Sequence, residues 1–291
     1  MDLATGITGV AATLEGQALA LCNVAGGIVS ESVQVADSRW YKAAGLMDSP
    51  RVITAGPINE NAALLGKIKS GDFACFRGTV PADDDSRTWQ QRVCDWIQDA
   101  EAELIEWRGL PGKVHAGFAA AIDSLLSVTS AFSFDNKRML FFGHSKGAAL
   151  AVLSAALHAS QGGESTVITF GGPRAANVAF TKAFAKMPIR MRRYENSGDL
   201  VPLTPLRIAH AEMLGHMLGV RIPSFDYESV GELQFIDGSG EIGGESAFQR
   251  VKAEARLVEL LAERKFTAVR DAHSIGFGGA YAAAVAPEVA P

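Results

Sequence analysis

The segment that most constrains the fold is a short turn between a strand-like run and a helix-like run. Arg138–Phe142 (RMLFF) leads into Gly143–Gly147 (GHSKG), and Lys146–His158 (KGAALAVLSAALH) has the small and apolar residues of a buried helix. The turn matches the pattern G-x-S-x-G between a strand and a helix, in which the serine has strained backbone angles and needs small residues two positions on either side. The sequence therefore predicts a tight unit whose helix N-terminus directs N–H groups at the turn.

Similar strand-like and helix-like runs alternate along the rest of the chain. This alternation predicts an α/β fold with a mostly parallel central sheet and helices on both faces, and ligands that bind beyond the carboxyl ends of the strands. Neither repeats nor low-complexity linkers divide the chain, so we expect a single domain over residues 1–291. The expected strands are 72–77, 138–142, 165–170, 190–195 and 232–236, and the expected helices are 116–129, 146–158, 175–186 and 245–264.

Composition excludes several classes of protein. With 48% hydrophobic and 20% charged residues the chain is not disordered, and its net charge of −5 argues against a nucleic-acid partner. The three cysteines are odd in number and lack a CxxC spacing, so neither a disulfide framework nor a zinc cluster is expected. Polar residues interrupt Met1–Ser30, which predicts no transmembrane segment there. Residues 1–38 contain no Lys or Arg and so no recognisable secretory signal; we expect a cytoplasmic protein or a secreted one without its leader.

Ser145 in the turn is a candidate nucleophile, and it needs a histidine base that a carboxylate orients. In α/β hydrolases the acid follows the serine in the chain, after a later strand. Asp199 fits this position, because it lies in a loop directly after the expected strand Arg190–Glu195. Asp226 and Asp237 are competing candidates, but neither has a comparable position at a strand end.

Three histidines follow Asp199, and spacing alone does not choose among them as the base. His210 and His216 flank Glu212 with H-x5-H spacing, which differs from the HExxH pattern of zinc sites, so we expect no metal there. His273 lies in a late loop before a final helix-like segment, from which a base can reach the turn.

Several motifs, taken in order, resemble those of the class 3 lipases, the fungal-type triacylglycerol lipase family of α/β hydrolases. The resemblance runs from about Phe73 to Tyr281. The matching segments are Phe76–Thr79 (FRGT), Val114–Phe118 (VHAGF), Gly143–Gly147 (GHSKG), Thr169–Asn177 (TFGGPRAAN), Asp199–Pro202 (DLVP) and His273–Ser274 (HS).

The resemblance implies an α/β-hydrolase fold and a serine carboxylic-ester hydrolase of lipase type. Ser145 would be the nucleophile, His273 the base and Asp199 the residue that orients it. Thr79 and the backbone N–H of Lys146 would form the oxyanion hole. The implied substrate is a small ester or a lipid, with transient contact to a lipid interface.

Lys146 departs from the family pattern, which usually has leucine after the nucleophile. We expect its side chain to extend to solvent. An alternative is that it pairs with one of the three carboxylates of Asp83–Asp85 and helps to hold a lid. The resemblance implies such a lid within residues 80–95, where Trp89 and Val93 stand among polar residues; the alternative there is an ordinary surface helix.

A further motif, Gly238–Gly243, matches G-x-G-x-x-G, but the strand and acidic residue that complete a nucleotide-binding unit are missing, so no cofactor is expected. Two alternatives to a lipase stay open. One is an esterase for short-chain or aromatic (feruloyl-type) esters, and the other is a hydrolase-like binding module without catalysis.

Overall fold

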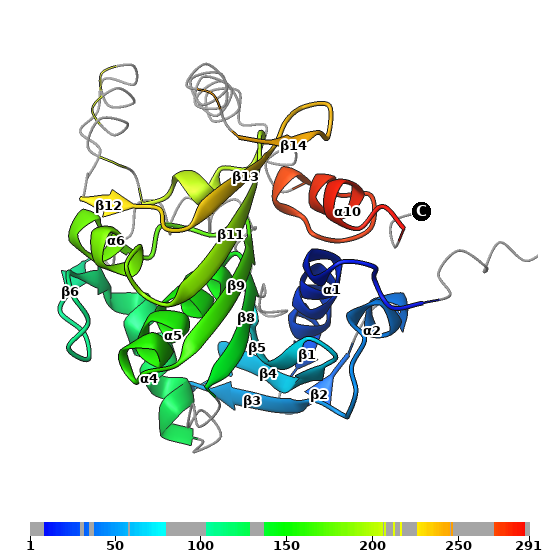
Figure 1. The fold of residues 1–291 in the computed structure, drawn as a ribbon, viewed down its shortest axis with the longest axis horizontal. Coiled ribbons are helices and arrows are strands. Elements are labelled where there is room, and N and C mark those ends of the chain that lie inside the picture. Colours follow the sequence, from blue (N-terminus) through cyan, green and yellow to red (C-terminus); the bar gives the residue numbers. More distant parts are fainter. Residues whose placement is uncertain are drawn as a thin grey trace, which may run out of the picture.

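The computed structural model describes residues 9–29, 32–34, 38–57, 59–79, 103–128, 137–205, 207, 212, 216, 226–244, 246 and 271–288. An eight-stranded sheet forms its centre (Figure 1), in the order β14-β13-β11-β9-β8-β5-β4-β3. The five strands from β13 to β5 run parallel, and β3, β4 and β14 are antiparallel additions at the edges, which confirms the mostly parallel sheet. The strands are β3 (Arg51–Ala55), β4 (Asn61–Ile68), β5 (Gly71–Phe76), β8 (Arg138–His144), β9 (Glu164–Phe170), β11 (Ile189–Asn196), β13 (Glu232–Ile236) and β14 (Ile242–Gly243).

All five strands expected from the sequence are present, within two residues of the expected bounds. Strands β3 and β4, which form an antiparallel hairpin-like extension of the sheet, were not expected. Asn61–Ile68 (NAALLGKI) has its first four residues all buried and shows no alternation of polar and apolar residues. A strand buried on both faces therefore has none of the period-two pattern by which a half-buried strand is recognised.

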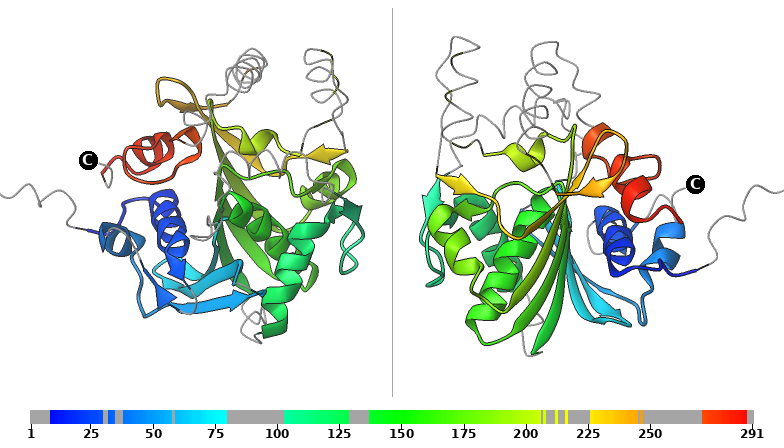
Figure 2. Two further views of the ribbon diagram at one scale, coloured as in Figure 1. Left: turned by 180° about the vertical axis from the view of Figure 1, so that it is seen from behind. Right: turned by 45° about the horizontal axis from the view of Figure 1, so that its top comes forward.

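Helices cover both faces of the sheet (Figures 1 and 2), as predicted. Neighbouring residues of one strand pack in different hydrophobic cores, because successive side chains of a strand point to opposite faces of the sheet. Phe141 of β8 packs with the first group of helices and Phe142 with the second. The first group is α4 (Ala116–Val128), α5 (Lys146–Ser160) and α6 (Val178–Phe184), and the second is α1 (Leu14–Gly26), α2 (Ser38–Ala44) and α10 (Ala280–Val285).

Helix α1 occupies the N-terminal region that was considered above as a leader or a membrane span. It begins after Thr13, whose side-chain oxygen accepts a hydrogen bond from the N–H of Gly16 at 3.0 Å. Most of its residues are buried against the sheet, and Cys22 places its sulfur 3.8 Å from that of Cys75 on β5. Within the described residues, no helix combines the length and apolar character that a membrane crossing requires.

Some expected elements are shifted or lie outside the described residues. Helix α6 begins at Val178 rather than at Ala175, because the Asn177 side chain caps it by accepting the N–H of Phe180 at 3.0 Å. The expected helix 245–264, apart from Ser246, and the lid within 80–95 lie outside the described part of the chain. The described residues also form two smaller sheets, one of β6 (Leu104–Ile105), β7 (Val114–His115), β10 (Ala176–Asn177) and β12 (Tyr227–Glu228), and one of β1 (Ile28–Val29) and β2 (Ser32–Val33).

Candidate active site

Ser145 occupies the turn between β8 and α5 with a backbone conformation that L-residues rarely adopt. Its φ is 57° and its ψ is −133°, and its N–H donates to the carbonyl oxygen of Phe170 at 3.1 Å. Such conformations cost about 1–3 kcal/mol and persist only where the surroundings enforce them. The strained serine predicted from the G-x-S-x-G pattern is therefore present, at the carboxyl end of a central strand.

The two glycines of the pattern are required by close backbone contacts. A Cβ atom on Gly143 would lie 2.1 Å from the carbonyl oxygen of Gly147. A Cβ atom on Gly147 would lie 2.1 Å from the carbonyl oxygen of Phe76 on β5. The turn thus folds back on itself and against the neighbouring strand, which no larger residue would permit.

His273 and Asp199, 74 residues apart, form a buried pair. The Nδ1 atom of His273 lies 2.9 Å from Oδ1 and 2.8 Å from Oδ2 of Asp199. Because a carboxylate only accepts, Nδ1 carries the hydrogen, and in the neutral ring Nε2 then has the lone pair that can take up a proton. The N–H of Val201 also donates to Oδ1 of Asp199 at 3.0 Å, which fixes the carboxylate from the loop that carries it.

Tyr281 supports the same carboxylate from the C-terminal helix α10, a role that was not predicted from the sequence. Its hydroxyl donates to Oδ2 of Asp199 at 2.7 Å and accepts the N–H of Asn196 at 3.1 Å. Burial, reinforced by the charge of Asp199, raises the pKa of Tyr281 well above 10, so the hydroxyl keeps its hydrogen. The only sequence signal was an isolated aromatic residue in an alanine-rich helix, which is equally typical of core packing.

His144 lies beside the pair rather than acting within it. Its Nε2 atom lies 2.8 Å from the carbonyl oxygen of His273. Burial, and secondarily the nearby His273, lower the pKa of His144 well below 6.5. Because His144 directly precedes Ser145, this contact brings the turn and His273 together.

The two residues expected to form the oxyanion hole flank the serine from different elements. Thr79 follows Gly78, where a Cβ atom would lie 3.3 Å from Cβ of Ser145, so the end of this segment runs next to the serine. Thr79 itself is exposed. Lys146 is the first residue of α5, and the N–H groups in the first turn of a helix have no acceptor within that helix.

The Lys146 side chain does not extend into solvent, which corrects the expectation from the sequence. Its ammonium donates to Oδ1 of Asn61 at 2.6 Å and to the carbonyl oxygen of Glu60 at 3.3 Å. Burial is the main cause that lowers the pKa of Lys146 to about 8; the negative charge of Glu60 opposes this lowering, and the positive charge of Arg77 adds to it. The alternative partners Asp83–Asp85 lie outside the described residues.

The competing candidates that the structure describes take no part in this arrangement. Asp237 is a turn residue between β13 and β14, where its Oδ1 accepts the N–H groups of Ser239 and Glu241 at 2.8 and 3.1 Å. This turn, within the G-x-G-x-x-G match, joins two antiparallel strands rather than a strand and a helix. His216 is exposed, and His210 lies outside the described residues. Among the described residues, no cluster of side chains could hold a metal ion.

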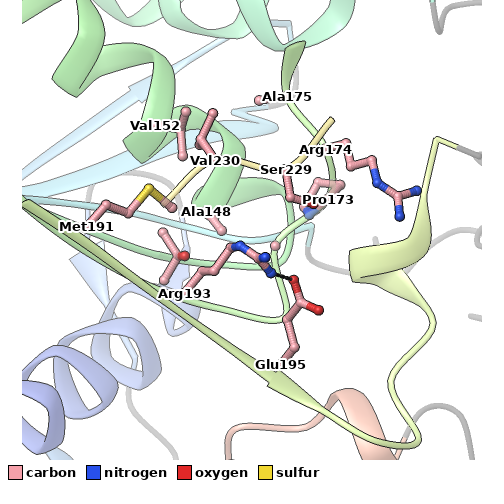
Figure 3. Close-up of a pocket in the computed structure, with 12 residues that line it drawn as sticks. Ala148, Val152, Pro173, Arg174, Ala175, Met191, Arg193, Glu195, Ser229 and Val230 are labelled. Atoms are coloured by element: carbon pink, nitrogen blue, oxygen red, sulfur yellow. Dashed lines mark hydrogen bonds and ion pairs between the residues drawn. The ribbon is translucent and has the colours of Figure 1, made fainter. Parts of the chain in front are cut away.

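A small pocket lies between the start of α5 and the segment after β9 (Figure 3). Its wall includes the Arg193–Glu195 ion pair of β11, with Ala148 of α5 and Gly172 close to the turn. Glu195 is 5% exposed, so its negative charge is balanced inside the protein by Arg193. The pocket's described lining includes none of the three candidate catalytic residues, so it is adjacent to the site and not part of it.

The sheet, the strained serine and the buried histidine–aspartate pair together define an α/β-hydrolase fold. Residues 74–208, just under half of the chain, match the family model of the class 3 lipases. A triacylglyceride lipase of Rhizomucor miehei has a similar fold, with a TM-score of 0.57, 20% identity and coverage of 80% of this chain and 84% of that one.

Two curated plant relatives are phospholipases A1 by name. Phospholipase A1-II 1 of Oryza sativa subsp. indica is 33% identical over 197 residues, which are 57% of this chain and 46% of the relative. Phospholipase A1-Igamma2, chloroplastic, of Arabidopsis thaliana is 40% identical over 72 residues, which are 22% of this chain and 14% of the relative. The chain thus matches less than half the length of either relative.

Proposed function

We propose that the protein is a serine carboxylic-ester hydrolase of lipase type that acts through an acyl-enzyme. The observation that carries this proposal is the buried His273–Asp199 pair, with Nδ1 within 2.9 Å of both carboxylate oxygens. His144 contacts the main chain of His273 and directly precedes Ser145, which is held at a φ of 57°. The match of residues 74–208 to the family model of the class 3 lipases supports the same reaction.

In the proposed reaction the Ser145 hydroxyl attacks the carbonyl carbon of the ester while Nε2 of His273 takes its proton. The tetrahedral intermediate places its negative oxygen near the N–H of Lys146 and near Thr79. One such hydrogen-bond donor lowers the activation free energy by about 3 kcal/mol. His273 then protonates the departing alcohol. Water, activated by the same imidazole, releases the acid and restores Ser145.

Each supporting contact has a defined chemical consequence in this sequence of steps. Asp199 stabilises the positive charge that His273 acquires during the attack. Tyr281 and the N–H of Val201 satisfy the carboxylate in its buried position, so that it stays correctly oriented.

The central experiment compares the wild type with Ser145→Ala. We expect Ser145→Ala to abolish both the hydrolysis of p-nitrophenyl esters and labelling by a fluorophosphonate probe, with an unchanged circular dichroism spectrum. Activity retained in this variant would contradict the role of Ser145. A folded wild type that neither hydrolyses esters nor reacts with the probe would favour a binding module without catalysis.

The substrate class is tested separately. Rates on p-nitrophenyl esters from acetate to palmitate, with and without a lipid interface, separate a lipase from an esterase for short-chain or aromatic esters. Because the two plant relatives carry the name phospholipase A1, the series also includes a diacyl phospholipid beside a triacylglycerol. We expect a long-chain lipid ester to be the preferred substrate.

A further inference from the structure

His144 is the last residue of β8, and its ring is in contact with the ring and the main chain of His273. The ring centroids are 4.4 Å apart at an interplanar angle of 34°, and Nε2 of His144 is 2.8 Å from the carbonyl oxygen of His273. Since a carbonyl oxygen only accepts hydrogen bonds, Nε2 of His144 carries the hydrogen. The residue before the candidate nucleophile is therefore bonded to the backbone of the candidate base.

We propose, on the basis of the function proposed above, that His144 is a positioning residue for His273. Its N–H holds the His273 main chain, and its ring supports the neighbouring imidazole, so that the base stays next to Ser145 through the reaction. The strand that presents the nucleophile thus also places the base.

The other contacts of this segment do not duplicate the one made by His144. Asp199 bonds the side chain of His273 at Nδ1, which orients the ring but not the backbone. Asn196 donates its side-chain N–H to the carbonyl oxygen of Ala272 at 2.9 Å, one residue earlier. His144 alone among these links the carbonyl of His273 to the turn that carries Ser145. Such a link matters because a misplacement of about 1 Å at a reacting group can cost about a hundredfold in rate.

The charge state of His144 is compatible with this role. When His273 takes the proton of Ser145 it becomes positive, and a second positive ring at 4.4 Å would oppose that step. Burial and the nearby His273 lower the pKa of His144 well below 6.5, which keeps the ring neutral at neutral pH. His144 can thus donate its hydrogen bond without adding a charge beside the imidazolium.

Two substitutions separate the hydrogen bond from the bulk of the ring. His144→Phe keeps a flat ring against His273 but has no N–H, whereas His144→Gln keeps an N–H at the same number of bonds from Cβ. We expect His144→Phe to lower kcat on p-nitrophenyl butyrate about tenfold with little change in KM, the loss typical of one positioning hydrogen bond. We expect His144→Gln to recover most of this loss.

His158→Gln is the matched control. His158 is a buried histidine in the last turn of α5, bonded through Nδ1 to Oγ of Ser165 at 2.9 Å, and about 20 Å along the helix from Ser145. This variant should lower the melting temperature and leave kcat unchanged. The positioning role is overturned if His144→Phe has the wild-type kcat, or if His144→Gln is as slow as His144→Phe.

A spectroscopic measurement distinguishes failure of this inference from failure of the proposed function. The proton between Nδ1 of His273 and Asp199 gives a downfield NMR resonance when the pair is fixed. We expect this resonance in the wild type and in His144→Gln, and its broadening or loss in His144→Phe. An unchanged resonance in His144→Phe overturns the positioning role. A wild type without Ser145-dependent hydrolysis overturns the proposed function instead, whatever the resonance does.

Discussion

Tyr281 and Asp199 are 82 residues apart, yet the tyrosine hydroxyl donates to Oδ2 of the aspartate at 2.7 Å inside the protein. The same hydroxyl accepts the N–H of Asn196 at 3.1 Å, at the end of strand β11. Helix α10 therefore contributes to the site through a residue that both supports the carboxylate and satisfies a buried backbone group. Loss of the hydroxyl removes the acceptor that Tyr281 gives to the buried N–H of Asn196 and one of the donors to Asp199, which is costly.

Tyr281→Phe tests this contact. The hydroxyl is lost while the ring still packs on Phe170, so we expect kcat to fall about tenfold and stability to fall by about 1–2 kcal/mol. Steady-state kinetics and urea unfolding measure the two effects. Tyr194→Phe is the control, because Tyr194 also packs on Phe170 but is not bonded to Asp199 in the described structure. Equal kinetic loss in both variants would contradict a specific role of Tyr281.

Gly171→Ala tests the space beside the His273–Asp199 pair. Gly171 has a φ of +54°, and a Cβ atom there would lie 2.5 Å from Oδ2 of Asp199 and 2.9 Å from Nδ1 of His273. Because the new methyl group must displace the pair, we expect activity to fall about a hundredfold. Gly162→Ala is the control, since Gly162 also has a positive φ, of +89°, but has open space around its Cβ position. It should lose stability and keep its activity; a fully active Gly171→Ala would show that the pair tolerates displacement.

Lys146→Leu tests the buried ammonium at alkaline pH. The folded pKa of about 8 lies below the usual 10.5, so between these values the unfolded chain binds a proton that the folded chain does not. The stability of the wild type should therefore rise relative to Lys146→Leu as pH increases from 8 to 10.5. Urea unfolding at pH 7 and pH 10 measures the difference, with exposed Lys182→Leu as the control. A difference that stays constant with pH would contradict the lowered pKa.

His115→Asn tests a buried histidine at acid pH. Burial lowers the pKa of His115 to about 4, and its Nδ1 accepts the N–H of Gly117 at 3.0 Å. Between pH 6.5 and 4 the unfolded chain binds a proton that the folded chain does not, so stability falls as pH falls through this range. Asparagine keeps an acceptor in the position of Nδ1 and does not titrate, so the variant should lose less stability than the wild type between pH 6.5 and 4. The same acid dependence in both proteins would contradict this prediction.

The local units of the fold and the order of the candidate catalytic residues could be predicted from the sequence. Periodicity and turn residues are local properties, so they suffice to place the five central strands and the turn at Ser145. The choice of His273 depended on the family motifs, since spacing left three histidines open. Helix α1 and strands β3 and β4 were missed, because segments buried on most sides lack the alternation that reveals an element.

The contacts between distant segments were decided by the tertiary structure alone. Nothing in an alanine-rich C-terminal stretch indicates that Tyr281 reaches Asp199, or that His144 bonds the backbone of His273. From the sequence, the Lys146 side chain was expected to extend to solvent or to pair with one of Asp83–Asp85, and only the hydrogen bond to Asn61 shows where the ammonium lies.

The sequence by itself determined the strained turn, because the two glycines that the turn sterically requires, Gly143 and Gly147, lie within five consecutive residues. Tertiary structure decided which polar groups satisfy one another in the interior. The physical reason is that a buried donor or acceptor must find a partner wherever the chain brings one, and that partner can be any distance away in the sequence.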